Sequence, residues 1–201
     1  MPPLRLCPPL RLKGNMMEHL ISQIERYIPF NEQEEKDKAQ ILSALRSGAE
    51  LITRKNPVMH LTASAWVVSP DRKQVVMAYH NLYRSWAWLG GHADGDWNLQ
   101  RVARKEVMEE CGLADIKAVS DDILSLEVLC VAGHEKKGEY LSSHLHLNVT
   151  YLFEADPKLP LRVKEDENSA VGWIDVADIP RKSTEEWFCS RIYSKLCAKA
   201  K

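Results

Sequence analysis

The sequence predicts an α+β fold, in which helices sandwich a mixed β-sheet and a helical extension precedes the sheet. Three patterns predict this class: apolar residues at helical spacing near the N-terminus, alternating apolar and polar residues after residue 57, and a helical segment between two groups of strands. The chain has 201 residues, of which 45% are hydrophobic and 27% are charged. This composition suits one domain with an extension.

The N-terminal quarter of the chain predicts a leader followed by two helices. Residues 1–15 contain four prolines and no apolar core of signal-peptide length, so we expect a disordered leader. Residues 17–28 carry leucine and isoleucine at helical spacing. Asn31 and Glu34 have the spacing of a capping box for a second helix, which extends to about Arg46. The apolar face of this helical pair needs a partner, and a homodimer is one hypothesis for it.

The rest of the chain predicts the sheet and two more helices. A β-hairpin is expected from residues 60–69 and 74–80, which flank a turn-rich segment. Further strands are expected at 124–133, 143–154 and 171–174, and helices at 98–111 and 184–198. Ser183 and Glu186 form a candidate capping box for the last helix. The predicted domains are the leader over 1–15, the helical extension over 16–56 and the sheet domain over 57–201.

Charge and cysteine content exclude several classes of protein. Lys and Arg total 27 against 28 Asp and Glu, a net charge of -1, which provides no broad attraction for nucleic acid or an anionic membrane. Apolar runs are shorter than the roughly 18 residues of a membrane span. The five cysteines include no CxxC pair, so neither a thiolate zinc site nor a disulfide framework is expected. We expect a cytoplasmic protein that binds neither membranes nor nucleic acids in general.

Three glutamates on one predicted helix carry the strongest chemical signal. Glu106, Glu109 and Glu110 lie within about 100° of one another on a helix that advances ~100° per residue. Their mutual repulsion is offset by a bound divalent cation, and oxygen ligands suit Mg²⁺ best. The alternative is a solvated acidic face. However, Leu99 and Val102 lie on the same side of the helix as Glu106 and Glu110, which favours a metal site.

Residues 91–113 resemble the signature of the Nudix hydrolases, which reads Gly-x5-Glu-x7-Arg-Glu-hydrophobe-x-Glu-Glu-x-Gly-hydrophobe. The positions that match are Gly91, Glu106, Val107, Glu109, Glu110, Gly112 and Leu113. Trp97 replaces the first Glu of the signature and Lys105 replaces the Arg. Both missing groups are of the kind that orients metal-binding carboxylates. Asp96 and Arg104 lie one residue away and are candidates to compensate.

The resemblance implies a Nudix-type mixed sheet and hydrolysis of a phosphoanhydride in a nucleoside diphosphate linked to another group. Such an enzyme uses Mg²⁺ or Mn²⁺ to stabilise developing charge and to activate water. By position, Glu106 and Glu110 become metal ligands, Glu109 a ligand or the base that deprotonates water, and the Gly91 carbonyl a further ligand. The substrate is a small nucleotide-type diphosphate whose identity the sequence leaves open.

Several other residues are candidates for substrate contact. His92 follows Gly91, and His144 and His146 alternate with apolar residues on the face of their strand turned away from the core. His134, His144 and His146 also suggest zinc, but a clear third ligand is lacking. The remaining candidates are Trp86, which stacks on a base or packs in the core, Arg84 and Arg54 as phosphate contacts, and Glu167 as an alternative base.

Two rival functions remain. An isomerase of isopentenyl diphosphate on the same fold needs a proton donor, commonly a cysteine, opposite a glutamate, and only Cys111 lies near the signature. A nucleotide sensor without catalysis is the second rival, in which Trp97 and Lys105 have weakened the chemistry. Isomerisation, phosphate release and ligand binding without turnover distinguish these functions.

Overall fold

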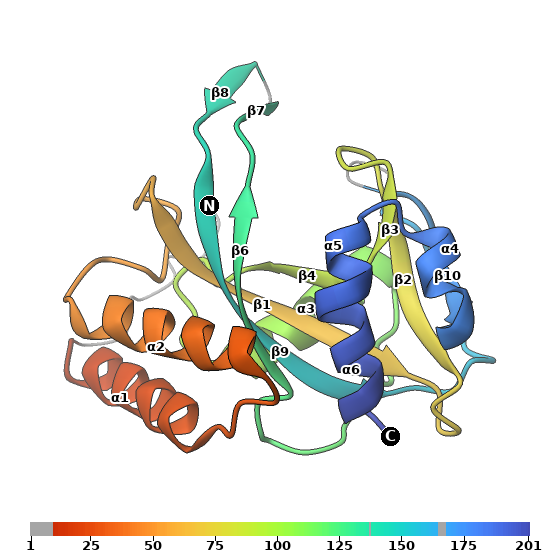
Figure 1. Cartoon of the computed structure of the whole chain (residues 1–201), viewed down its shortest axis with the longest axis horizontal. Helices are drawn as coiled ribbons and strands as arrows, with labels where there is room; N and C mark the ends of the chain where they lie inside the picture. The colour runs from red at the N-terminus through yellow and green to blue at the C-terminus, as the bar shows by residue number, and fades with distance from the viewer. Residues whose placement is uncertain (1–9, 137, 165–167) are drawn as a thin grey trace, which may run out of the picture.

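A computed structural model of the chain describes residues 10–136, 138–164 and 168–201. In Figure 1 a curved sheet crosses the molecule, with the N-terminal helices on one side and the C-terminal helices on another. The helices are α1 (Leu10–Arg26), α2 (Glu32–Arg46), α3 (Leu99–Cys111), α4 (Ile179–Lys182), α5 (Glu186–Phe188) and α6 (Ser194–Lys199). The strands are β1 (Met59–Val68), β2 (Gln74–His80), β3 (Ser85–Ala87), β4 (Leu89–His92), β5 (Lys117–Ala118), β6 (Ser125–Val131), β7 (His134–Lys136), β8 (Glu139–Leu141), β9 (His144–Glu154) and β10 (Asn168–Asp175).

The main sheet is mixed, as the sequence predicts. Its central path runs β10-β2-β1-β9-β5, while β3 pairs with β2, β4 with β1 and β6 with β9. Strands β1 and β9 are parallel, in register from Met59↔Leu145 to Val68↔Glu154, and the other pairs of this sheet are antiparallel. The predicted hairpin is only partly formed, because β1 and β2 meet at Val68↔Val75 and β2 then pairs with β3 and β10.

The N-terminal helices belong to the same core as the sheet. Leu20, Ile24, Ile41 and Leu45 are buried in one cluster with the β1 residues of one sheet face. The apolar face on which the homodimer hypothesis depends is therefore covered within the chain. Helix α1 begins at Leu10, inside the segment expected as a leader, and residues 1–9 of that leader lie outside the described residues.

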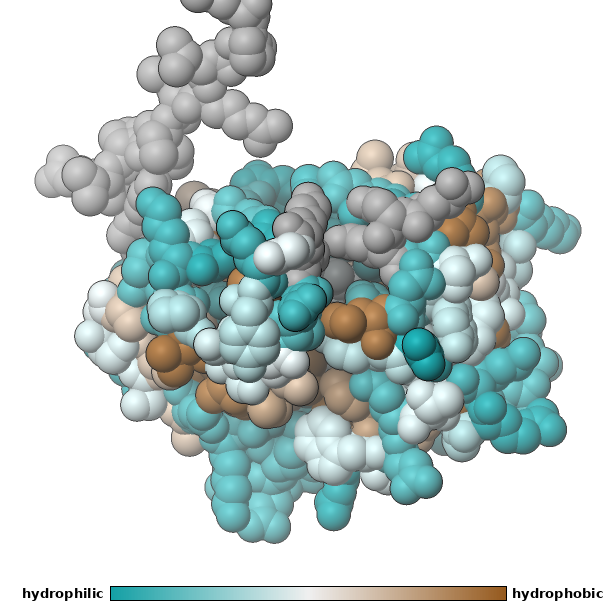
Figure 2. Space-filling view, turned by 90° about the horizontal axis from the view of Figure 1, so that it is seen from above, coloured by the Kyte–Doolittle hydropathy of each residue, from teal (hydrophilic) through white to brown (hydrophobic). Residues whose placement is uncertain are grey.

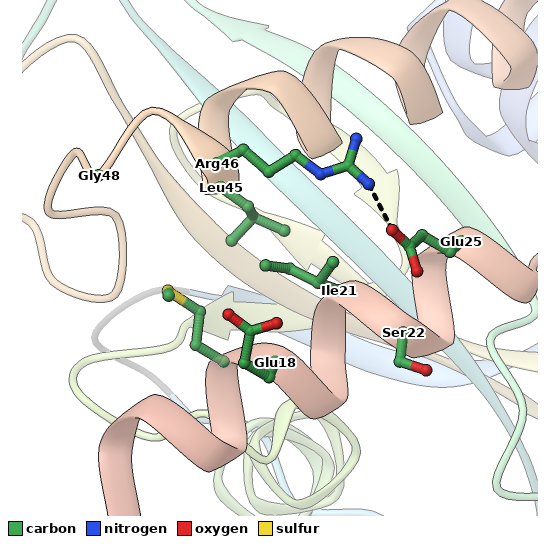
Figure 3. Close-up of a pocket in the computed structure, with 8 residues that line it drawn as sticks. Glu18, Ile21, Ser22, Glu25, Leu45, Arg46 and Gly48 are labelled. Carbon is green, nitrogen blue, oxygen red and sulfur yellow. Dashed lines mark hydrogen bonds and ion pairs between the residues drawn. The ribbon is translucent and has the colours of Figure 1, made fainter. Parts of the chain in front are cut away.

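A pocket of about 360 Å³ lies between α1 and α2 (Figure 3). Leu45 and Ile21 face each other across it, and Arg46 reaches over it to form an ion pair with Glu25. None of the predicted catalytic residues lines this pocket. On the face seen in Figure 2, apolar residues form small patches separated by hydrophilic ones.

The two faces of the sheet have different environments. Leu61, Ala63 and Val67 of β1 pack with α3 and the N-terminal helices, while Trp66 and Val68 pack with the C-terminal helices. We expected the second face of β9 to lie away from the core, and this is wrong for Asn148 and Thr150, which are 1% and 0% exposed. Both side chains donate hydrogen bonds to the buried Glu127 carboxylate of β6, and Lys195 of the C-terminal helical segment contacts the same carboxylate, so their polar groups are satisfied in the interior.

A buried charge network joins the extension to this face of the sheet. Lys195 Nζ of α6 lies 3.0 Å from Glu34 Oε1 of α2 and 3.0 Å from Glu127 Oε1 of β6, and all three side chains are at most 1% exposed. Asn148 donates to Glu127 at 2.9 Å, and the hydroxyl of Ser64 donates to Asn148 at 2.9 Å. These bonds supply the polar partners that buried charges require.

The predicted capping box at the start of α2 is half formed. Asn31 Oδ1 accepts a hydrogen bond from Glu34 N at 3.0 Å, as expected. The second bond of a capping box, from Asn31 N to the Glu34 carboxylate, is not formed. Its carboxylate accepts hydrogen bonds from Phe30 N at 2.7 Å and from the Tyr27 hydroxyl at 2.6 Å, because the same carboxylate also serves the buried network.

The Glu34 carboxylate predicts a loss of stability in acid. Burial alone would raise its pKa, but hydrogen bonds from Tyr27 and Phe30 and the charge of Lys195 outweigh burial and lower the pKa from 4.5 to about 2. A lowered folded-state pKa stabilises the protein above pH 4.5, and that stability is lost as the pH falls from 4.5 towards 2. Chemical denaturation across this range should show a shallower pH dependence in Glu34→Gln than in wild type. Parallel curves for the two proteins would contradict the assignment.

The C-terminal helical segment differs from its prediction in detail. It begins at Glu186, and a π-helical turn, Cys189–Tyr193, separates α5 from α6. Ser183 does not cap this helix. Its hydroxyl instead lies 3.0 Å from the Ser85 hydroxyl of β3, which ties the chain to the sheet before the helix starts. Among the described residues, no helix combines the length and the apolar character needed to cross a membrane.

Candidate functional site

Helix α3 is held against the sheet by its apolar side. Leu99, Val102, Ala103 and Val107 are buried, and Asn98 caps the helix by accepting a hydrogen bond from Arg101 N. Gly112 ends the helix with φ +76°, in the left-handed conformation that glycine adopts without strain. The predicted helix is confirmed to within one residue at its start, and its placement aims two of the glutamates at β4.

Glu106 and Glu110 lie against the two glycines of β4. Gly90 N donates a hydrogen bond to Glu110 Oε2 at 3.1 Å, and Glu110 is only 6% exposed. A Cβ atom at position 91 would lie 2.5 Å from the carboxylate carbon of Glu106, so this carboxylate packs directly on the Gly91 backbone. The structure therefore brings together Glu106, Glu110 and Gly91, as the resemblance to the signature implies.

Glu109 occupies the outer edge of this group. Its side chain is 43% exposed, whereas that of Glu106 is 13% exposed. Lys105 Nζ lies 3.0 Å from Glu109 Oε1 and 3.6 Å from Glu106 Oε1, and its pKa is raised mainly by the hydrogen bond with Glu109. Lys105 thus contacts two of the glutamates itself, although it lacks the planar fork of arginine.

The neighbours suggested as compensating residues have other partners. Asp96 binds Arg101 through two hydrogen bonds of 2.8 and 2.7 Å. Arg104 Nη2 lies 3.5 Å from the Ala114 carbonyl oxygen, at the far end of the helix. Trp97 packs on the main apolar core. The carboxylate that the signature places at position 97 is therefore replaced by an apolar contact, whereas Lys105, at the position of the signature Arg, contacts Glu106 and Glu109.

The close approach of Glu106 to Gly91 predicts the effect of adding a methyl group. In Gly91→Ala the new Cβ displaces the Glu106 carboxylate, and a shift of about 1 Å at a reacting centre costs on the order of 10²-fold in rate. Gly172→Ala is the matched control, because its Cβ would make an ordinary 3.7 Å contact with Trp86. Steady-state hydrolysis rates of the two variants test this expectation, and equal rates would contradict it.

The donor atoms of this site fit a hard divalent cation. Three carboxylates from one helix and the backbone of Gly91 offer oxygen ligands, and Mg²⁺ prefers one or two carboxylates together with water and substrate phosphate. Lys105 neutralises only part of the charge of the carboxylates. Glu106, Glu109, Glu110 and the Gly91 carbonyl are the groups that would hold the ion.

The predicted histidines gather in a separate cluster. His144 Nε2 lies 3.2 Å from His146 Nε2, and the His92 ring centroid lies 4.9 Å from that of His146. Burial, together with the neighbouring histidines, lowers the pKa of His146 to about 2. His134 is more distant, with its ring centroid 6.4 Å from that of His144.

Sequence reasoning missed His60, which lies at the centre of this cluster. Its ring centroid is 5.0 Å from those of His92, His144 and His146. The sequence pattern identifies His60 only as the first residue of a strand. His60 lies beside His146 because β1 pairs with β9 in parallel, and no local pattern in the sequence signals this pairing.

The other candidates for substrate contact have different surroundings. Trp86 is half-buried against the second core cluster, with its ring edge-on to Tyr79 at 5.9 Å, which supports packing. Arg54 forms a bidentate ion pair with Asp94, at 3.0 and 2.6 Å. Arg84 is exposed in the turn before β3, with φ +50°. Glu167 lies outside the described residues.

Comparison with known proteins agrees with the signature. The family model of the NUDIX domain matches residues 58–195. No curated protein matches the chain. Among solved structures, the Escherichia coli dihydroneopterin triphosphate pyrophosphohydrolase is 13% identical with a TM-score of 0.52, over 75% of this chain and 100% of that one. This likeness supports the fold.

Two further structures have lower TM-scores. A NUDIX-family hydrolase from Clostridium perfringens is 16% identical, with a TM-score of 0.47 over 68% of this chain and 95% of that one. The C. elegans Ap4A hydrolase is also 16% identical, with a TM-score of 0.49 over 69% and 93%. The family match spans more than half of the chain and includes the helix with the three glutamates. The chain therefore belongs to the Nudix hydrolases, a family of enzymes that act on diphosphate-containing substrates.

Proposed function

We propose that this enzyme is a Mg²⁺- or Mn²⁺-dependent pyrophosphohydrolase that cleaves a phosphoanhydride in a nucleoside diphosphate linked to another group. The observation that carries the proposal is the packing of the Glu106 and Glu110 carboxylates on the Gly90–Gly91 backbone. This arrangement fixes two acidic side chains and a backbone segment on rigid elements, as a catalytic site requires.

Each residue of the site has a distinct task in this proposal. Bound divalent metal supplies charge stabilisation at the phosphate oxygens and an activated water. Glu110, held by Gly90 N, and Glu106, held against Gly91, provide fixed carboxylate oxygens. Glu109 is exposed enough to meet substrate and water, so it serves as a ligand or accepts the proton from the attacking water. Lys105 positions Glu109.

The substrate is proposed to be a small nucleotide-type molecule. His92 follows Gly91 in the sequence, but its side chain lies on the face of β4 opposite the one that Glu106 contacts, so its sequence position alone does not favour it as a substrate contact. A cytoplasmic location is a further prediction from the sequence. A homodimer stays a hypothesis, although the chain itself covers the apolar face that suggests it. A solution mass near 23.0 kDa at micromolar concentration would contradict the homodimer.

A substrate screen tests the proposed function. Phosphate release, coupled to a phosphatase where needed, is measured with Mg²⁺ or Mn²⁺ on nucleoside triphosphates, nucleotide sugars, dinucleotide cofactors, ADP-ribose and a prenyl diphosphate. We expect metal-dependent cleavage of one nucleotide class. If no substrate in the panel releases phosphate but calorimetry detects nucleotide binding, the result would instead support a nucleotide sensor without catalysis.

The isomerase rival is disfavoured by the environment of Cys111. This residue is buried in the core, its Sγ donates to the Val107 carbonyl at 3.0 Å, and burial raises the pKa of its thiol to about 11. The thiol is thus engaged with the backbone of its own helix and is protonated at neutral pH, whereas the isomerase needs a cysteine placed opposite a glutamate. Isomerisation of the prenyl diphosphate without phosphate release would nevertheless overturn the hydrolase assignment.

A further inference from the structure

We propose that His60, His92 and His146 form a second metal site, separate from the carboxylates of α3, which binds Zn²⁺ or a similar divalent transition-metal ion. One ring nitrogen from each histidine lies within 4.8 Å of those of the other two. Zinc–nitrogen bonds of about 2.0–2.1 Å place two imidazole nitrogens of one ion at most about 4 Å apart, so small side-chain movements close the site.

Three adjacent strands bring these histidines together. Strand β1 lies between β9 and β4 at this end of the sheet, and His60 pairs with His146 across the parallel ladder. His92 pairs with Thr62, two residues along β1 from His60 and on the same face. The ligands therefore come from rigid neighbouring strands, which hold a metal site more accurately than loops do.

The hydrogen bonds of His60 point to a ligand. Its Nδ1 lies 3.3 Å from the Asn56 carbonyl oxygen and donates to it, so Nε2 carries a lone pair. His60 is 5% exposed, and its Nε2 atom is buried without a hydrogen-bond partner in the described part of the chain. An imidazole oriented by a backbone carbonyl, with its second nitrogen unpartnered, is the usual arrangement of a metal-binding histidine.

The chemistry of the cluster selects the ion. Imidazole nitrogens favour Zn²⁺, Co²⁺, Ni²⁺ or Cu²⁺ over Mg²⁺, which prefers oxygen. His144 is a candidate fourth ligand. Its Nδ1 lies 2.8 Å from the Ser142 carbonyl oxygen and its Nε2 faces His146, so its second nitrogen is also directed into the cluster.

The two metal sites lie on opposite faces of β4. A Cβ at position 91 would meet Glu106, whereas a Cβ at position 90 would meet Ser64 on the other face of the strand. His92 shares the face of Gly90, because successive residues of a strand alternate. An ion held by the three histidines would thus cross-link β1, β4 and β9 beside the glycine segment that supports Glu106, without using the glutamates.

Cobalt spectroscopy tests this second site. Metal-free protein is titrated with Co²⁺ in excess Mg²⁺, because nitrogen-rich tetrahedral Co²⁺ absorbs far more strongly than octahedral Co²⁺ on carboxylates. We expect one equivalent to give the intense bands, in wild type and also in Glu106→Gln, so the result does not depend on the proposed hydrolase. His60→Gln and His146→Gln should lose at least about tenfold in affinity. His19→Gln, exposed on α1, is the matched control and should bind as wild type does.

Two results would overturn the site. The first is the absence of intense bands in wild type, and the second is unchanged affinity in both histidine variants. Circular dichroism establishes that each variant is folded. If neither variant folds, X-ray absorption at the cobalt edge of the wild-type complex decides the question. Three or more imidazole ligands support the proposal, and fewer than three contradict it.

Discussion

Glu106→Gln and Glu110→Gln are each expected to lower metal-dependent hydrolysis by roughly 10³-fold. Each change removes a negative charge from the group that packs on Gly90 and Gly91, while the side chain keeps its size. Loss of a metal ligand forfeits several kcal/mol of transition-state stabilisation, and about 1.4 kcal/mol corresponds to each tenfold change in rate. The measurement is kcat/KM on the substrate that the screen identifies, together with calorimetric Mg²⁺ binding.

The control for this prediction is Glu35→Gln, a change of the same type on the exposed side of α2. It should leave both the rate and Mg²⁺ binding unchanged. Glu109→Gln separates the two roles left open for that residue. If Glu109 is the base, the variant loses turnover but keeps its Mg²⁺ affinity, and if Glu109 is a metal ligand, the variant loses both. Near wild-type turnover in Glu106→Gln and Glu110→Gln would show that the metal binds elsewhere.

Lys195→Met is expected to destabilise the fold by about 3–5 kcal/mol. Lys195 is the cation within 3.0 Å of both Glu34 and Glu127, and the change leaves these two carboxylates buried without it. Removing one member of a buried ion pair leaves an uncompensated charge in a medium of low dielectric constant, which costs this amount. Urea denaturation monitored by tryptophan fluorescence gives the free energy of unfolding.

An exposed lysine provides the matched control. Lys36 pairs with Glu32 at 2.9 Å on the surface of α2, so Lys36→Met should leave the denaturation midpoint unchanged. The triple change Lys195→Met, Glu34→Gln and Glu127→Gln should recover part of the loss, because it removes the buried charges together. Equal stability of Lys195→Met and Lys36→Met would contradict the role of the network.

The helix with the three glutamates could be predicted from the sequence because its signals are local. The spacing of Glu106, Glu109 and Glu110, the cap at Asn98 and the glycine at its end all lie within one short segment. The periodicity predicts the helix and which of its side chains share a face, whereas the proximity of Gly91 to Glu106 is implied only by the resemblance to the Nudix signature.

The histidine cluster and the charge network could not be predicted, because both depend on contacts between distant parts of the chain. His60 meets His146 only through the parallel register of β1 with β9. Likewise, nothing near Glu34 in the sequence indicates Lys195 as its partner. The periodicity of residues 143–154 correctly separates the two faces of β9 but does not show that the C-terminal helices cover Asn148 and Thr150.

The ion pair between Glu34 and Lys195 determines where this protein can be truncated without loss of stability. The NUDIX match begins at residue 58, but Glu34 and the apolar side of α1 and α2 precede it. A truncated chain that starts at residue 58 would lack α1 and α2, so the β1 residues that these helices cover would be exposed. It would also lack Glu34, one of the two carboxylates that pair with Lys195. The segment that matches the family is therefore smaller than the folded domain, and helices α1 and α2 are an integral part of that domain.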